Sequence, residues 1–312
     1  MRQFARSIVV AASMLTLLGK PVLAQLKCET TNDPDEVQLI SDDVLNFLKA
    51  IERIDSGENA EIALGEEYLD KASPGLREYL REHDLDAGQF AAAISKDPER
   101  YSALEKLPAQ LASQEDEVRR AFHELNRIIP EVTFIPIYYL VGVQRGFFAE
   151  PSEYGLMIAI SELAEDPSLV ALGLVHETVH VQQALTVGIE EYMQVFGPKM
   201  SLLSLSLREG AAYFLTTLAL NRQTLPEAYD YFIENEEALW EQFKSELGNR
   251  DPGEWLFRKP EDRNRPQDLG YLMGARIVES YYNQSSDKAQ AITDILAIVD
   301  YPDFLKKSGY GN

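Results

Sequence analysis

The stretch with the clearest chemical potential contains two histidines four residues apart. His176 and His180 enclose Glu177 in the order His-Glu-Thr-Val-His, which matches the zinc-binding pattern H-E-x-x-H. On an α-helix, residues four apart lie on one face, so two imidazoles at this spacing can bind one tetrahedral metal ion. Zinc lowers the pKa of a bound water to about 7, and a neighbouring carboxylate can accept its proton. The motif therefore predicts a zinc site with Glu177 as the general base.

The flanking sequence predicts the helix that this spacing requires. Asp166 is a suitable N-cap, Pro167 suits the first helical position, and an apolar run without proline continues to Val187. Because the run is apolar nearly all round, we expect the helix to be buried. The alternative interpretation is a structural helix whose two histidines are hydrogen-bonded and hold no metal.

Two histidines leave zinc short of a third protein ligand. The extended pattern H-E-x-x-H-x-x-G-x-x-H is excluded, because Gln183 replaces its glycine and Thr186 its last histidine. Glu190 and Glu191 follow the motif closely. They lie in an acidic, loop-like stretch, where solvated carboxylates are expected.

Glu209 is the stronger candidate for the third ligand. It is the one acidic residue in the apolar segment 204–215, where only Arg208 is comparably polar. A buried carboxylate needs a compensating charge, which a zinc ion would supply. The alternative is an ion pair with Arg208 or with another cation.

The HETVH motif, followed by Arg-Glu-Gly-Ala-Ala at 208–212, resembles the glutamate zincins. These are metallopeptidases whose third ligand is a glutamate on a later helix. More narrowly, the chain resembles bacterial predicted Zn-dependent proteases that pair H-E-x-x-H with a later E-G-x-A and are related to gliding-motility envelope lipoproteins. Segment 270–282 resembles a C-terminal element of that group, and the resemblance covers about residues 131–282.

This resemblance implies that the ligands are His176, His180 and Glu209 and that Glu177 is the general base. The separation of His180 and Glu209 is longer than in thermolysin-like enzymes, and no acidic residue lies one turn after Glu209, where many of those carry one.

An acyl-transfer hydrolase also needs a hydrogen-bond donor for the oxyanion. Tyr271, in the family-like segment, is the first candidate and Tyr213 is the second. With 15 tyrosines in the chain, a packing role is the alternative for both.

The N-terminal sequence and the charge predict export. Residues 1–24 have the basic, apolar and small-residue regions of a secretory signal peptide, with cleavage after Ala24. Their removal would change the formal charge from −22 to −25, which argues against nucleic acid and anionic membrane surfaces as partners. No later stretch is long enough to span a membrane. Cys28 is the only cysteine, so an intrachain disulfide is excluded.

Hydrophobic patterning predicts an α+β fold that is mainly helical and zincin-like, with a small sheet beside the motif helix. Residues 25–130 read as a helical cap, and residues 131–312 read as the metallopeptidase region. The two regions form either one compact domain or two separate ones. Strands are expected at 132–141 and 154–160, separated by a loop, with Pro136 marking the first as an edge or irregular strand.

Three further sequence expectations concern smaller features. His83 and His123 lie in charged surroundings and are expected at the surface. A C-terminal helix carries Gly270 and Gly274 at a spacing typical of close helix packing.

The leading functional hypothesis is an exported zinc-dependent metallopeptidase, periplasmic or secreted, that cleaves peptide or protein substrates. Its alternative is a non-catalytic zinc-binding envelope assembly or binding protein with a vestigial site. The intact Glu177 argues against this, since a purely structural site does not need a base. A di-iron helical bundle requires a second E-x-x-H, and neither His83 nor His123 has a glutamate three residues before it. The sequence does not indicate an oligomeric state.

Overall fold

The computed structural model describes residues 26–129, 131–144, 147–163 and 166–311. The expected signal peptide lies outside these residues. The chain divides into two compact units, the first comprising the described residues up to Arg120 together with Thr133–Glu177, and the second comprising Ala121–Val132 and Thr178–Asn312. This division differs from the expected one at residue 130, because the sheet groups with the N-terminal helices. No helix of the described part has the length and apolarity of a membrane span.

The first unit begins with short helices whose starts follow from local capping. Ser73 accepts a hydrogen bond from the Leu76 amide, and Pro74 opens the helix after it. Asp86 and Gln89 form a reciprocal capping box at the next helix. The α-helices of this region are α1 (Asp42–Asp55), α2 (Ala60–Leu64), α3 (Pro74–Glu82), α4 (Ala87–Lys96), α5 (Pro98–Ser102) and α6 (Leu107–Ile128), the last continuing into the second unit.

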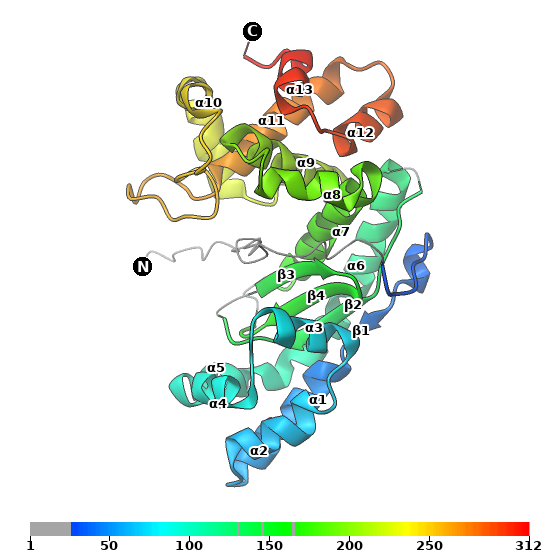
Figure 1. Ribbon diagram of the computed structural model, residues 1–312, viewed down its shortest axis with the longest axis vertical. Coiled ribbons are helices and arrows are strands. Elements are labelled where there is room, and N and C mark those ends of the chain that lie inside the picture. The colour runs from blue at the N-terminus through cyan, green and yellow to red at the C-terminus, as the bar shows by residue number, and fades with distance from the viewer. Residues whose placement is uncertain (1–25, 130, 145–146, 164–165, 312) are drawn as a thin grey trace. The chain divides into compact units, whose positions relative to one another are not determined.

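A four-stranded sheet completes the first unit, in the order β1-β2-β4-β3. Its strands are β1 (Leu39–Ile40), β2 (Ile137–Val141), β3 (Phe147–Ser152) and β4 (Gly155–Ile160). Strands β1 and β4 run parallel to β2, whereas β3 runs antiparallel to β4. Every residue of β2 and β4 is buried, as expected for strands that read as continuous apolar runs. Helix α3 packs against β2 and β4 (Figure 1).

The structure corrects two expectations about these strands. The segment expected to be a loop contains the edge strand β3, and Pro151 is tolerated there because one side of an edge strand needs no ladder partner. The strand after Pro136 is not an edge strand, since β2 begins at Ile137 and lies between β1 and β4. The Pro136 carbonyl instead accepts a hydrogen bond from Leu156, so the proline borders the ladder without interrupting it.

The second unit is helical. Its elements begin with the C-terminal part of α7 (Leu169–Val187) and continue with α8 (Ile189–Met193), α9 (Leu202–Leu220), α10 (Pro226–Glu246), α11 (Leu269–Gln284), α12 (Lys288–Leu296) and α13 (Tyr301–Ser308). Helices α9 and α11 cross at their glycines. A Cβ on Gly274 would lie 1.7 Å from the Ser206 carbonyl oxygen, and one on Gly210 would lie 2.3 Å from the Ala275 nitrogen. The expected close packing at Gly274 is therefore present.

Candidate metal centre

Helix α7 positions the H-E-x-x-H motif. It begins at Leu169, slightly later than the sequence predicts, because Asp166 and Pro167 form the turn before it. The Asp166 carboxylate accepts from the Ser168 amide at 2.9 Å, and its carbonyl accepts from the Leu169 amide at 3.1 Å. The motif residues of α7 are buried, as expected for a helix that is apolar nearly all round.

Helix α9 brings Glu209 to the site. Glu209 is only 1 % exposed, although it carries a carboxylate. The guanidinium of the neighbouring Arg208 lies 4.2 Å from the Tyr192 ring centroid and donates to the Tyr301 hydroxyl at 2.8 Å. The glycine after Glu209 lets α11 cross α9 at van der Waals contact. A carboxylate as deeply buried as Glu209 needs a compensating charge or a proton.

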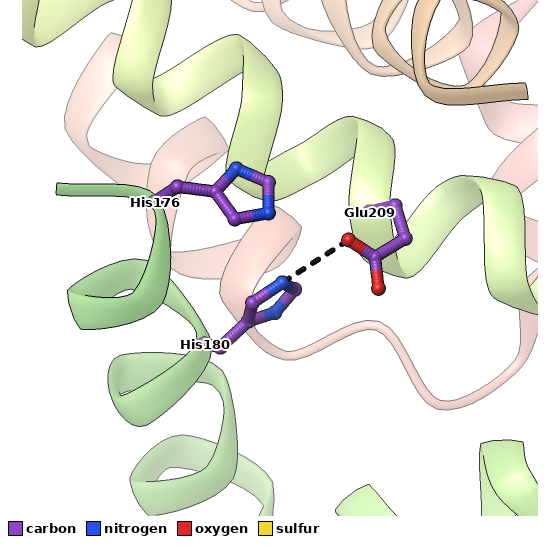
Figure 2. A group of neighbouring side chains, drawn as sticks. All are labelled: His176, His180 and Glu209. Atoms are coloured by element: carbon purple, nitrogen blue, oxygen red, sulfur yellow. Dashed lines mark hydrogen bonds and ion pairs between the residues drawn. The ribbon is translucent and has the colours of Figure 1, made fainter. Parts of the chain in front are cut away.

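Three buried side chains converge at this point. Donor atoms of His176, His180 and Glu209 all lie within 4.8 Å of one another. Figure 2 shows the two imidazoles reaching from one helix toward the carboxylate on another. The His180 Nε2 to Glu209 Oε2 distance is 3.2 Å. Ligands of a tetrahedral zinc with bonds of about 2.0–2.1 Å lie about 3.3 Å apart, so this pair matches one edge of such a site.

Gln183 fixes which nitrogen of His180 faces the carboxylate. Its amide nitrogen donates to the Arg208 backbone carbonyl at 3.1 Å, and its Oε1 lies 2.8 Å from His180 Nδ1. A carbonyl only accepts, so the amide NH2 must face Arg208, and Oε1 must face the imidazole. His180 Nδ1 therefore carries a proton and donates it to Gln183.

The resulting arrangement requires a cation or a proton. In a neutral His180, Nε2 carries a lone pair, and this faces a lone pair of Glu209 at 3.2 Å in a buried space. A second proton on the imidazole would make this an ion pair of His180 and Glu209, whereas the three donors together could hold a metal ion. A metal ion uses all three donors. Two imidazole nitrogens and one carboxylate oxygen are a donor set that zinc accepts in catalytic sites.

The other predicted site residues lie in different settings. Glu177 follows His176 on α7 and is buried, while the converging group consists of the two histidines and Glu209. Tyr271 lies in the first turn of α11, with its ring edge-on to Phe257 at 6.3 Å between centroids. The Tyr213 hydroxyl donates to the Gln223 side chain at 2.9 Å.

The acidic residues just after the motif lie apart from the converging group. Glu190 is exposed, and Glu191 pairs with Lys199, as expected for carboxylates in solvent.

Sequence reasoning missed the contribution of Asp268. This residue precedes α11 in the left-handed region, with φ of 64°, and its carboxylate accepts from the Phe257 amide at 3.3 Å. Burial, together with the negative charge of Glu209, raises the pKa of Asp268 to about 6. Asp268, just before α11, is thus close enough to Glu209 for their negative charges to interact. The only sequence signal is an acid directly before an apolar helix, which a capping role explains equally well.

His123 is exposed, as expected, whereas His83 is only partly exposed. The His83 side chain is 13 % exposed, and its Nε2 lies 3.3 Å from the Glu150 carboxylate of β3. The last turn of α3 lies close to β3, and this strand partly covers His83. The charged neighbours of His83 in the sequence had suggested that it is solvated.

Comparison with known proteins adds no relative to these observations. No family model, curated protein or solved structure matches the chain. Any functional conclusion therefore rests on the geometry of the buried side chains alone.

Proposed function

We propose that the chain is an exported zinc-dependent metallopeptidase of the glutamate-zincin type. The observation that carries the proposal is the convergence of donor atoms of His176, His180 and Glu209 within 4.8 Å, with all three side chains buried. When bound, zinc would supply Lewis acidity to polarise a substrate carbonyl and to acidify water.

Glu177 supplies the proton acceptor. It is buried beside a ligand on the same helix, where a carboxylate outside the ligand set can take a proton from an attacking water and return it to the leaving amine. This role needs Glu177 near the metal and free of coordination.

Substrate and oxyanion binding follow from other elements. An extended peptide can pair with an edge strand through main-chain hydrogen bonds, and β1 and β3 are the edge strands of the sheet in the first unit. For the oxyanion, Tyr271 in the first turn of α11 stays the first candidate from its place in the family-like segment, and Tyr213, whose hydroxyl donates to Gln223, is the second.

The decisive experiment replaces Glu177 by Gln in the exported chain. The amide keeps the shape and cannot accept the proton, so zinc should stay bound while hydrolysis of an unfolded protein or a mixed peptide library falls by roughly 10²–10⁴-fold. A chelator should abolish wild-type cleavage, and added zinc should restore it.

Glu190→Gln is the matched control, since it changes an exposed glutamate near the same motif. Wild-type cleavage by Glu177→Gln would overturn the mechanism. If zinc-loaded wild type cleaves nothing across a broad library, the non-catalytic envelope protein becomes the better hypothesis.

A further inference from the structure

The side chain of Gln183 joins the two helices that carry the converging group. It lies on α7, three residues after His180, and is buried. One end of its amide accepts from His180 Nδ1 at 2.8 Å, and the other end donates to the carbonyl of Arg208, the residue before Glu209 on α9, at 3.1 Å. A single neutral side chain therefore contacts the ring of one candidate ligand and the backbone next to another.

We propose that Gln183 is the positioning residue of the metal centre: it holds His180 in the Nδ1-protonated tautomer and ties α7 to α9 at Glu209. This inference rests on the proposed function, because it assigns Gln183 to the same metal. Both hydrogen bonds are needed for the argument. The bond to Arg208 fixes the orientation of the amide, and the oriented amide then fixes the proton of His180.

The neutrality of Gln183 has a chemical consequence. Histidines bound to metals commonly donate their second nitrogen to a carboxylate, a backbone carbonyl or water, and a carboxylate makes the histidine a stronger donor to the metal. An amide oxygen keeps the same tautomer without adding a negative charge. With Glu209 as the only anionic ligand, a bound Zn²⁺ keeps more of its positive charge for a substrate carbonyl.

The neighbouring residue provides a matched control. Gln182 is also a buried glutamine of α7, but its amide donates at 3.2 Å to the Thr178 carbonyl within the same helix. Replacing either glutamine by Leu removes a buried amide from one helix. The change at Gln183 removes the hydrogen bonds to His180 and to the Arg208 carbonyl of α9.

The test measures zinc affinity by competition with a chromophoric chelator in Gln183→Leu, Gln182→Leu and wild type, together with the visible absorption spectrum of the Co²⁺-substituted proteins. We expect Gln183→Leu to weaken zinc binding by about 10–100-fold and to shift the Co²⁺ bands, whereas Gln182→Leu should stay within about threefold. Wild-type affinity and an unchanged Co²⁺ spectrum in folded Gln183→Leu would overturn the inference.

Gln183→Glu tests the inference even if the leucine variant does not fold. The carboxylate still accepts from His180 but cannot donate to Arg208, so zinc binding should be weakened less than in Gln183→Leu, while the melting temperature of the metal-free protein should fall. A loss of zinc affinity as large as in Gln183→Leu would contradict the role of His180 orientation. His176→Ala separates the two proposals, because unchanged zinc binding there would refute the metal centre itself.

Discussion

Two regions of the molecule bury carboxylates, and they stabilise them by different means. In the second unit, Glu209 faces His180, and Arg208 turns away to Tyr192 and Tyr301. In the first unit, a carboxylate cluster is formed by Glu78 and Glu82 of α3 and Glu150 of β3, with Arg81 and His83 beside them. In both regions, removing a negative charge from water costs free energy, which other groups must offset.

The carboxylate cluster is neutralised by groups of the chain itself. Arg81 contacts both Glu78 and Glu82, and His83 contacts Glu150. Burial, with the nearby charges of Glu150 and Glu78, raises the pKa of Glu82 to about 8, so this carboxyl keeps its proton at neutral pH. One Glu82 oxygen is buried without an acceptor or donor partner in the described structure. Arg81 and this proton therefore offset the charges of Glu78 and Glu82, and His83 is the partner of Glu150.

The converging group has donors directed at one point instead. Its three donor atoms lie within 4.8 Å of one another, and Gln183 holds the proton of His180 on the far side of the ring. The comparison indicates that the arrangement of donors, more than the number of buried charges, distinguishes a metal site from an ion-pair cluster. Three sets of variants test this contrast.

The largest effect should come from removing a converging donor. Substitution of His176, His180 or Glu209 by Ala should each reduce zinc affinity by about 10³-fold or more, because zinc loses one of three protein bonds. Zinc content of the purified protein, measured by mass spectrometry after dialysis, checks this. Glu190→Ala and Glu150→Ala serve as controls from the exposed stretch and from the carboxylate cluster, and both should keep one zinc per chain. Full zinc retention in Glu209→Ala would show that another carboxylate is the ligand.

A smaller effect should follow from separating the helices behind Glu209. In Gly274→Ala, the added Cβ would lie 1.7 Å from the Ser206 carbonyl oxygen, so α11 must move away from α9. We expect the free energy of unfolding to fall by about 3 kcal/mol, with weaker zinc binding as a consequence. Chemical denaturation of the metal-free protein measures the first quantity. Gly248→Ala is the control, because nothing lies within 4 Å of its built Cβ, and an equal loss in both variants would contradict the packing explanation.

The smallest effect concerns the proton of the carboxylate cluster. Because the pKa of Glu82 is raised from 4.5 to about 8, the folded chain binds a proton that the unfolded chain releases, and this group's contribution to stability declines as pH rises from about 4.5 through about 8. The amide of Glu82→Gln does not titrate, so the variant lacks this loss of stability at high pH. The variant should match wild type near pH 4 and exceed it at pH 8.5 by about 1–2 kcal/mol, after allowance for solvent screening.

Urea denaturation across this pH range measures the difference between variant and wild type. Glu105→Gln, at an exposed position, should show no comparable gain. A constant difference between Glu82→Gln and wild type at all pH values would mean that Glu82 does not titrate in this range. Zinc content should be unchanged in this variant, since the carboxylate cluster is neutralised without metal.

The sequence by itself determined the local features of this protein. Four-residue spacing places His176 and His180 on one face of any helix, and an apolar run predicts that the helix is buried. The α+β class, with many helices and a small sheet, follows from hydrophobic periodicity in the same way. An acid in an apolar helix was enough to single out Glu209, because burial of a carboxylate demands compensation wherever it occurs.

Only the tertiary structure decided which groups meet. Arg208 and Glu209 are adjacent in sequence, yet the fold directs the guanidinium to Tyr192 and the carboxylate to His180, because neighbouring residues point to different sides of a helix. Gln183 and Asp268 acquire their contacts through helix crossings that local sequence does not encode. The edge strand β3 and the burial of His83 depend on pairing with distant segments in the same way. Local spacing fixes directions around one helix, whereas the positions of donors on different helices depend on the packing of the whole core.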